Sequence, residues 1–261
     1  MEMDRVWSCV GVALLVLATR VAAADPTLVA LTDGGALLRF TADRPGEVRT
    51  VRPSGVGRLV GIDVRPADGR LYGLTVDNDL YRIDAESGVG ELVATLTVAF
   101  NGAERSGIAF NPQADRLRLL AWDGQNLRVH PTLGATAVDR PLAWKPGDPN
   151  SGHQPRVTAA AYTHDVPDAP DTKLFVIDAE RDVLALQDPP NDGLLATVGP
   201  LGVDVGPLAG FAIHTDDAGH DAAWAATRGT LYAVDLGTGA ARPLGEIEGR
   251  PEVLSLAVLR R

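Results

Sequence analysis

The segment Asp77-Asn78-Asp79 resembles the beginning of a calcium-binding loop. Such a loop needs oxygen ligands at alternate positions, then a glycine and a distal bidentate glutamate. Here Leu80 and Tyr81 follow at once, and no glutamate stands at the required offset. The segment alone is therefore not an EF-hand, and a bound cation would need ligands from elsewhere in the chain.

Comparable acidic residues occur in other short polar segments between apolar runs, at Asp33, Asp123 and Asp178. If these segments share one face of the fold, the carboxylates of Asp33, Asp77, Asp123 and Asp178 could hold Ca²⁺ or a polar ligand, with Gln125 beside them. Aspartate is equally frequent in tight turns, where its carboxylate accepts bonds from nearby backbone amides. The turn is the preferred interpretation, and ligand binding is a hypothesis.

A second group combines imidazole and carboxylate side chains. His164 is followed by Asp165, and His214 is followed by Asp216 and His220. These side chains are ligands for zinc and other divalent ions. They stand in loops without the rigid i, i+4 spacing of a helix, so His164, His214, Asp216 and His220 are weak candidates for a metal site.

Catalytic motifs do not occur in the sequence. There is no G-x-S-x-G, H-E-x-x-H, phosphate-binding loop or G-x-G-x-x-G. A glycosidase would need two carboxyl groups about 5–10 Å apart. Asp63 stands on an apolar segment, but the matching positions are Ala109, Ala160 and Ala212. The sequence therefore does not indicate an enzyme.

An internal repeat shows which elements position these residues. The segment "PADGRL" (66–71) returns as "PQADRL" (112–117), and each copy joins two apolar segments. A third apolar segment, a glycine-containing turn and a fourth segment follow, as in "LYRID" (80–84), "AESG" (85–88) and "ELVATL" (91–96). Four short strands in about 46 residues are typical of one blade of a β-propeller.

The repeat occurs five times, and we name its strands A to D from the propeller axis outward. The A-strands are expected at 59–65, 106–111, 157–163, 208–214 and 253–259, and the B-strands at 27–31, 71–75, 117–121, 173–177 and 222–226. The first B-strand has no A-strand before it, and the last A-strand has no B-strand after it. Pairing these two would leave no free edge. The sequence predicts an all-β, five-bladed β-propeller over residues 25–261, closed by pairing of the C-terminal strand with the N-terminal blade. An open sandwich is the alternative.

Loops of a propeller separate onto two faces. The A–B and C–D turns lie on one face, and the B–C and D–A loops lie on the other, which more often carries function. The four aspartates above fall in B–C loops. Two long D–A loops, 97–105 and 140–156, reach the same face, and the second contains His153 and Arg156. Because insertions on one face of a repeat protein often form a binding surface, His153 and Arg156 are further candidates for ligand binding.

Composition limits the partners and the compartment. The net charge of −10 offers no basic surface for nucleic acid, so such a partner is not expected. Residues 6–18 form an apolar run, and Ala22-Ala23-Ala24 follows before Asp25, a pattern typical of a cleaved signal peptide over 1–24. The run is shorter than the ~20 residues of a spanning helix, and no later segment approaches that length. We expect a secreted or periplasmic monomer without a membrane span.

Three segments resemble the domain of unknown function 4394 family: "GIAFNPQADRLRLLAWDGQNLRVHPTLG" (107–134), "RVTAAAYT" (156–163) and "LFVIDAERDVLALQDPPNDGLLATVGPLGVD" (174–204). The resemblance implies an exported bacterial protein with propeller-like repeats, and it implies no catalytic residue. Among the matching polar positions, Arg116, Arg118 and Arg128 are expected to form a buried hydrogen-bond network between strands.

Two functional hypotheses follow. The first is an exported, non-enzymatic binding or interaction module that presents its B–C and D–A loops to a protein, a glycan or a small polar ligand. The second is a metal-assisted propeller hydrolase, similar to a lactonase. No cofactor is expected, apart from the Ca²⁺ that the aspartate loops could take.

Overall fold

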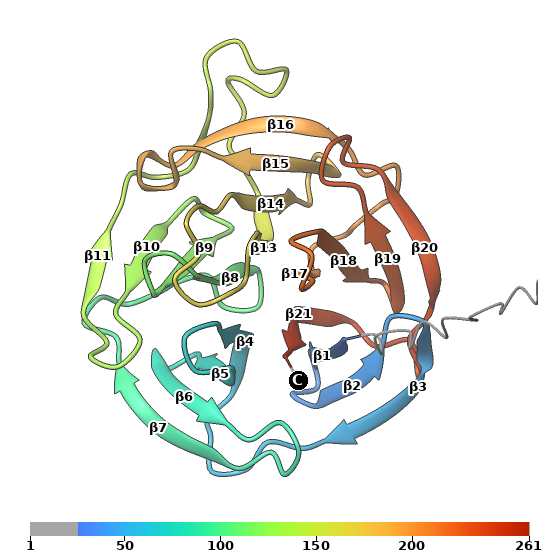
Figure 1. Ribbon diagram of the computed structural model, residues 1–261. Coiled ribbons are helices and arrows are strands. Elements are labelled where there is room, and N and C mark those ends of the chain that lie inside the picture. The colour runs from blue at the N-terminus through green and yellow to red at the C-terminus, as the bar shows by residue number, and fades with distance from the viewer. Residues whose placement is uncertain (1–25, 261) are drawn as a thin grey trace, which may run out of the picture.

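Five β-sheets surround one axis in the computed structural model, which describes residues 26–260 (Figure 1). The predicted signal peptide, residues 1–24, lies outside the described residues. The innermost strand of each sheet faces the axis, and each sheet is one blade of a β-propeller. The predicted five-bladed ring is thereby confirmed. No helix in the described part of the chain has the length and apolarity to cross a membrane.

Blade 1 contains both ends of the described chain. Its strands, from the axis outward, are β21 (Val253–Leu259), β1 (Thr27–Thr32), β2 (Leu37–Thr41) and β3 (Arg44–Val51). β21 pairs antiparallel with β1, so that Val258 is opposite Leu28 and Leu256 is opposite Ala30. The predicted closure by the C-terminal strand is therefore confirmed.

The other four blades follow in chain order. Blade 2 is β4 (Leu59–Arg65), β5 (Arg70–Thr75), β6 (Asp79–Ile83) and β7 (Gly90–Thr95). Blade 3 is β8 (Ser106–Asn111), β9 (Arg116–Ala121), β10 (Asn126–Val129) and β11 (Thr136–Val138). Blade 4 is β13 (Val157–Tyr162), β14 (Leu174–Asp178), β15 (Val183–Gln187) and β16 (Leu194–Pro200), with a 3₁₀ turn at Pro190–Asp192. Blade 5 is β17 (Gly210–Thr215), β18 (Asp221–Thr227), β19 (Thr230–Val234) and β20 (Ala241–Glu246).

Blade 4 carries an additional strand, β12 (Ala143–Trp144), which pairs parallel with β16. It belongs to the D–A loop 140–156, which the sequence predicts on the loop face of the ring. The loop instead begins along the outer edge of blade 4, and Figure 1 shows its tip projecting outward beyond β16. Backbone pairing to an open sheet edge decides this course, and the repeat pattern alone does not reveal it.

The core lies between blades. Leu28 and Ala30 of β1 pack against blade 5, whereas Val29 and Leu31 pack against blade 2. Successive side chains of a strand point to opposite faces, so an inner strand that is buried on both faces must be apolar at every position. This explains the continuous apolar runs of the A- and B-strands.

Small residues allow the A-strands to approach one another at the axis. A Cβ atom on Gly61 would lie 2.3 Å from Cδ1 of Ile108, and one on Gly107 would lie 2.8 Å from Cβ of Ala160. Between these strands the side chains of Ile108, Phe211 and Leu254 leave no room for a water molecule. The channel is therefore constricted between its two mouths.

The predicted buried network is confirmed in part. Arg118, which is 2% exposed, donates to Asp139 at 2.6 Å, and Arg128 donates to both carboxylate oxygens of Asp139 at 2.6 and 2.9 Å. Arg118 also donates to Asn191 of blade 4 at 2.8 Å. The prediction is wrong for Arg116, whose guanidinium bonds backbone carbonyls of its own turn instead.

Candidate functional site

Two arginines and one tryptophan meet at the mouth formed by the B–C and D–A loops. Trp122 directly follows β9, while Arg105 and Arg156 directly precede β8 and β13. The guanidinium carbons of Arg105 and Arg156 lie 5.2 and 5.6 Å from the ring centroid of Trp122. Both distances suit cation–π attraction. We call Arg105, Trp122 and Arg156 the arginine–tryptophan cluster.

Asp123 and Gln125, which the sequence marks as ligand candidates, form hydrogen bonds with loop 97–105 next to this cluster. Asp123 accepts a hydrogen bond from the Asn101 side chain at 2.6 Å. Gln125 accepts from the Asn101 amide at 3.0 Å and donates to the carbonyl of Ala99 at 2.9 Å. Asp123 and Gln125 therefore fix loop 97–105, and with it Arg105, beside blade 3.

The two arginines differ in their other contacts. Arg156 donates to the carbonyl of Trp122 at 3.2 Å and forms an ion pair with Glu180 at 3.3 Å. Arg105 is exposed and forms no ion pair within residues 26–260. The cluster thus contains one arginine held in place by the protein and one whose charge faces solvent.

The four B–C aspartates differ in their surroundings. Asp178 is fully buried and accepts from the amides of Arg156, Glu180 and Arg181 at 2.7, 3.0 and 3.0 Å. Asp33 accepts from the next amide at 2.8 Å, and Asp77 is exposed. Across residues 26–260, no three histidine, cysteine, aspartate or glutamate side chains are grouped to hold a metal. Each of these aspartates stands on its own blade. Of the candidate set, Asp123, Gln125 and Arg156 lie around Trp122, and Asp178 contacts the backbone amide of Arg156 from below the surface.

The histidines of the opposite face are also separate. Their Nδ1 atoms contact three different aspartates: His164 contacts Asp171 at 2.7 Å, His214 contacts Asp165 at 3.1 Å, and His220 contacts Asp216 at 3.3 Å. The backbone carbonyl of Asp171 is the main cause that raises the pKa of His164. The remaining candidate, His153, is exposed on the loop that follows β12.

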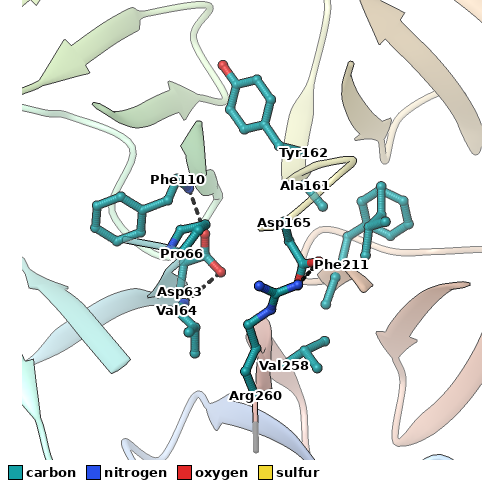
Figure 2. A pocket seen from close by; sticks show the side chains of 12 residues that line it. Asp63, Val64, Pro66, Phe110, Ala161, Tyr162, Asp165, Phe211, Val258 and Arg260 are labelled. Carbon is teal, nitrogen blue, oxygen red and sulfur yellow. Dashed lines mark hydrogen bonds and ion pairs between the residues drawn. The ribbon is translucent and has the colours of Figure 1, made fainter. Parts of the chain in front are cut away.

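The second mouth lies on the A–B face, where the five A-strands end. It contains a cavity of about 30 Å³, which Asp63, Phe110, Tyr162, Asp165, Phe211 and Arg260 help to line (Figure 2). Asp63 accepts from the amides of Val64 and Phe110 at 2.8 and 2.6 Å. Burial raises the pKa of Asp63 to about 7, although the two hydrogen bonds act to lower it. The negative charge of Asp165 raises this pKa further.

Asp165 is the acid of this mouth whose negative charge is balanced by cationic and hydrogen-bonding partners. It accepts from Nη2 of Arg260 at 2.9 Å and from the amide of Thr215 at 2.8 Å, in addition to its contact with His214. Burial acts to raise the pKa of Asp165, but the partners outweigh burial and lower it. Sequence reasoning noted Asp63 without assigning it a role, and it grouped Asp165 with the histidines as a metal-site carboxylate. It missed Arg260. The available signal was that Asp63 is the one acid within an A-strand.

The ring of five blades, four with four strands and blade 4 with a fifth, defines the chain as a β-propeller. The chain belongs to the family described as "Domain of unknown function (DUF4394)", whose model matches residues 36–257. No curated protein sequence matches it.

Solved structures show the same type of fold. A protein of unknown function from Bacteroides thetaiotaomicron VPI-5482 is similar with 14% identity and a TM-score of 0.52; the match covers 84% of this chain and 57% of that one. A chain of the nidogen/laminin complex is similar with 11% identity and a TM-score of 0.54, over 90% of this chain and 98% of that one. At these identities the likeness is one of fold alone.

Proposed function

We propose that this protein is a non-enzymatic binding module whose ligand contacts the arginine–tryptophan cluster through an anionic group. The observation that carries the proposal is the convergence of Arg105 and Arg156 on Trp122, at the mouth that the sequence predicts as the binding face. The chain as a whole has a net charge of −10, and Glu180 pairs with Arg156, so within residues 26–260 Arg105 is the cation of the cluster that is free for an anionic ligand.

The geometry favours a carboxylate-bearing ligand. A guanidinium presents its donors in a rigid planar fork that matches the two oxygens of a carboxylate. Stacking on Trp122 limits the orientations of both guanidinium groups, and the Glu180 pair restrains Arg156 further. A side chain that is ordered before binding loses less conformational entropy when the ligand arrives. Arg105 provides the charge that the protein itself does not neutralise.

We also propose that the module acts outside the cytoplasm. The apolar run 6–18 with its small-residue cleavage pattern supports export, and so does the exported family that the sequence resembles. Acidic glycans and acidic protein segments are ligands of suitable chemistry there. No contact within the described residues favours the metal-assisted hydrolase.

Titration with matched probes tests the proposal. Trigalacturonate represents an acidic glycan, a hexaglutamate peptide represents an acidic protein segment, and maltotriose is the neutral control. Tryptophan fluorescence and calorimetry would follow binding to the mature chain at low salt. We expect an acidic probe to bind and maltotriose not to bind, with affinity falling as salt rises.

Variants locate the site. Arg105→Gln and Arg156→Gln should each weaken binding of the acidic probe by about tenfold or more, or ~1.4 kcal/mol. Arg228→Gln is the matched control, because Arg228 is an exposed B–C arginine of blade 5 that pairs with Asp204 at 2.9 Å. The proposal fails if neither acidic probe binds, or if the Arg228 variant loses as much affinity as the other two.

A further inference from the structure

We propose that the mouth on the A–B face is a second binding site, which takes one primary ammonium group and uses the carboxylate of Asp63 as its acceptor. This site lies at the opposite end of the channel from the arginine–tryptophan cluster, and a constriction too narrow for water stands between them. It is therefore independent of the arginine–tryptophan cluster, and each proposal can fail alone.

The mouth already holds a cation of the chain itself. Arg260 follows β21, and its guanidinium reaches across to Asp165 of blade 4 at 2.9 Å (Figure 2). The rings of Phe110 and Phe211 point away from the cavity into the core between blades, where Phe110 packs against Tyr72 (Figure 2). The groups of the lining that can bind a cation are therefore its two carboxylates, Asp63 and Asp165. Arg260 pairs with Asp165, so the lining already binds one cation.

Asp63 is the acid that has no cationic partner. Asp165 has Arg260 and His214, and Asp115 has Arg65 at 2.5 Å. Within the described residues Asp63 receives only the two backbone amides of Val64 and Phe110. Each carboxylate oxygen therefore has one donor and keeps acceptor capacity toward the cavity. Its raised pKa reflects the same lack of compensation, because a buried carboxylate without a countercharge favours the proton.

The size of the cavity selects the head group. A volume of about 30 Å³ has room for one or two water molecules, and an ammonium group has nearly the size of water. The cavity opens to solvent, and the guanidinium of Arg260 already lines it, so a small cationic head group suits the space that remains. We expect the ammonium to enter the cavity and the rest of the ligand to extend into solvent, as in a small alkylamine or a lysine side chain of a partner.

Methylammonium is the probe that tests this site. The ¹³C signal of the Asp63 carboxyl group would be followed against pH, with tetramethylammonium at equal concentration as the control for bulk and ionic strength. The other titratable groups of the lining are Tyr162, Asp165 and Arg260, and His214 contacts Asp165. The signals of these groups would be followed as well. Because an ammonium binds only the ionised carboxylate, methylammonium should lower the pKa of Asp63, by about 1 at ten times its Kd.

A probe of two heavy atoms can reach only millimolar affinity, so a Kd in that range is expected. Asp63→Asn should weaken methylammonium binding at least tenfold. Asp217→Asn, which alters an exposed acid on an A–B loop of blade 5, should leave it unchanged. Since Asp63 joins β4 to β8, circular dichroism must show that the Asn variant is folded. The carboxyl titration on the unaltered chain needs no variant.

Equal pKa changes with methylammonium and tetramethylammonium would overturn the proposal, as would undiminished binding by the Asp63 variant. In either case the cavity would hold water only. Loss of anionic binding at the arginine–tryptophan cluster would not affect this result, because the two mouths are separate.

Discussion

At the scale of single residues, the environment decides what an aspartate does. Asp178 and Asp77 occupy equivalent B–C loops, but Asp178 is buried under three backbone amides and Asp77 is exposed. Asp63 stands on a strand and keeps part of its hydrogen-bonding capacity free. The sequence shows two aspartates at turns and one within a strand. Burial and the number of hydrogen-bond partners distinguish an aspartate that only supports the fold from one that can bind a ligand.

We expect Asp178→Ala to lower the free energy of unfolding by about 2–4 kcal/mol, because it leaves three amides without their acceptor in a buried loop. Asp77→Ala at the equivalent loop should change it by less than about 0.5 kcal/mol. Urea unfolding of both variants checks this. Equal losses would mean that the loops themselves, and not the amide contacts, determine stability.

The pH dependence of stability should carry the signature of Asp63. Its pKa is about 7 in the folded chain and 3.8 as the ordinary value, so the folded state binds the proton more tightly. Stability should therefore fall as pH rises from about 4 to about 7. The Asp63→Asn variant should not show this decrease. The difference in the free energy of unfolding between the variant and the unaltered chain should therefore shift in favour of the variant as pH rises from about 4 to about 7. Urea unfolding at several pH values would measure both proteins. If the free energy of unfolding changes with pH equally in the two, the raised pKa is not that of Asp63.

At the scale of elements, buried polar side chains connect strands and blades in addition to the backbone pairing of the strands. Asp139 joins Arg118 of β9 to Arg128 of β10, and Arg118 continues to blade 4 through Asn191. The arginines of the two strands predicted a network at this place, which Arg118 and Arg128 form and Arg116 does not. The pattern could not identify Asp139 or Asn191, because Asp139 follows β11 on another strand and Asn191 lies in the 3₁₀ turn of the neighbouring blade.

Asp139→Asn should destabilise the protein by about 3–5 kcal/mol, because the buried Arg118 loses its countercharge. Glu91→Gln removes the exposed partner of Arg82 and should cost at most about 1 kcal/mol. Thermal unfolding monitored by circular dichroism would compare the two. Similar losses from both changes would show that burial does not govern the strength of these pairs.

At the scale of the whole molecule, ring closure makes the blades interdependent. β21 supplies the inner strand of blade 1. The hydroxyl group of Ser255 on this strand donates a hydrogen bond to the carbonyl of Ile62 at 2.8 Å and accepts one from the amide of Ile62 at 3.1 Å. The same strand carries Arg260 to the A–B mouth. Closure therefore joins blade 1 to its neighbour and completes the lining of the second site in one step.

Deleting residues 253–260 should abolish cooperative unfolding, because blade 1 loses its inner strand and the edge of β1 becomes free. A synthetic peptide of these residues, added in trans, should restore protection of β1 amides from hydrogen exchange. A truncated chain that unfolds with an unchanged midpoint would contradict this role of β21.

The sequence by itself determined the strands, the five repeats and the closure, because apolar runs and turn residues act over a few neighbouring positions and recur with each blade. It also placed Asp123, Gln125 and Arg156 correctly on one face. Only the tertiary structure decided that Arg105 and Arg156 share Trp122, that loop 140–156 begins along the edge of β16, and that Arg260 faces Asp165. These contacts join residues from different blades, and no local pattern encodes the distance between segments that meet only when the ring closes.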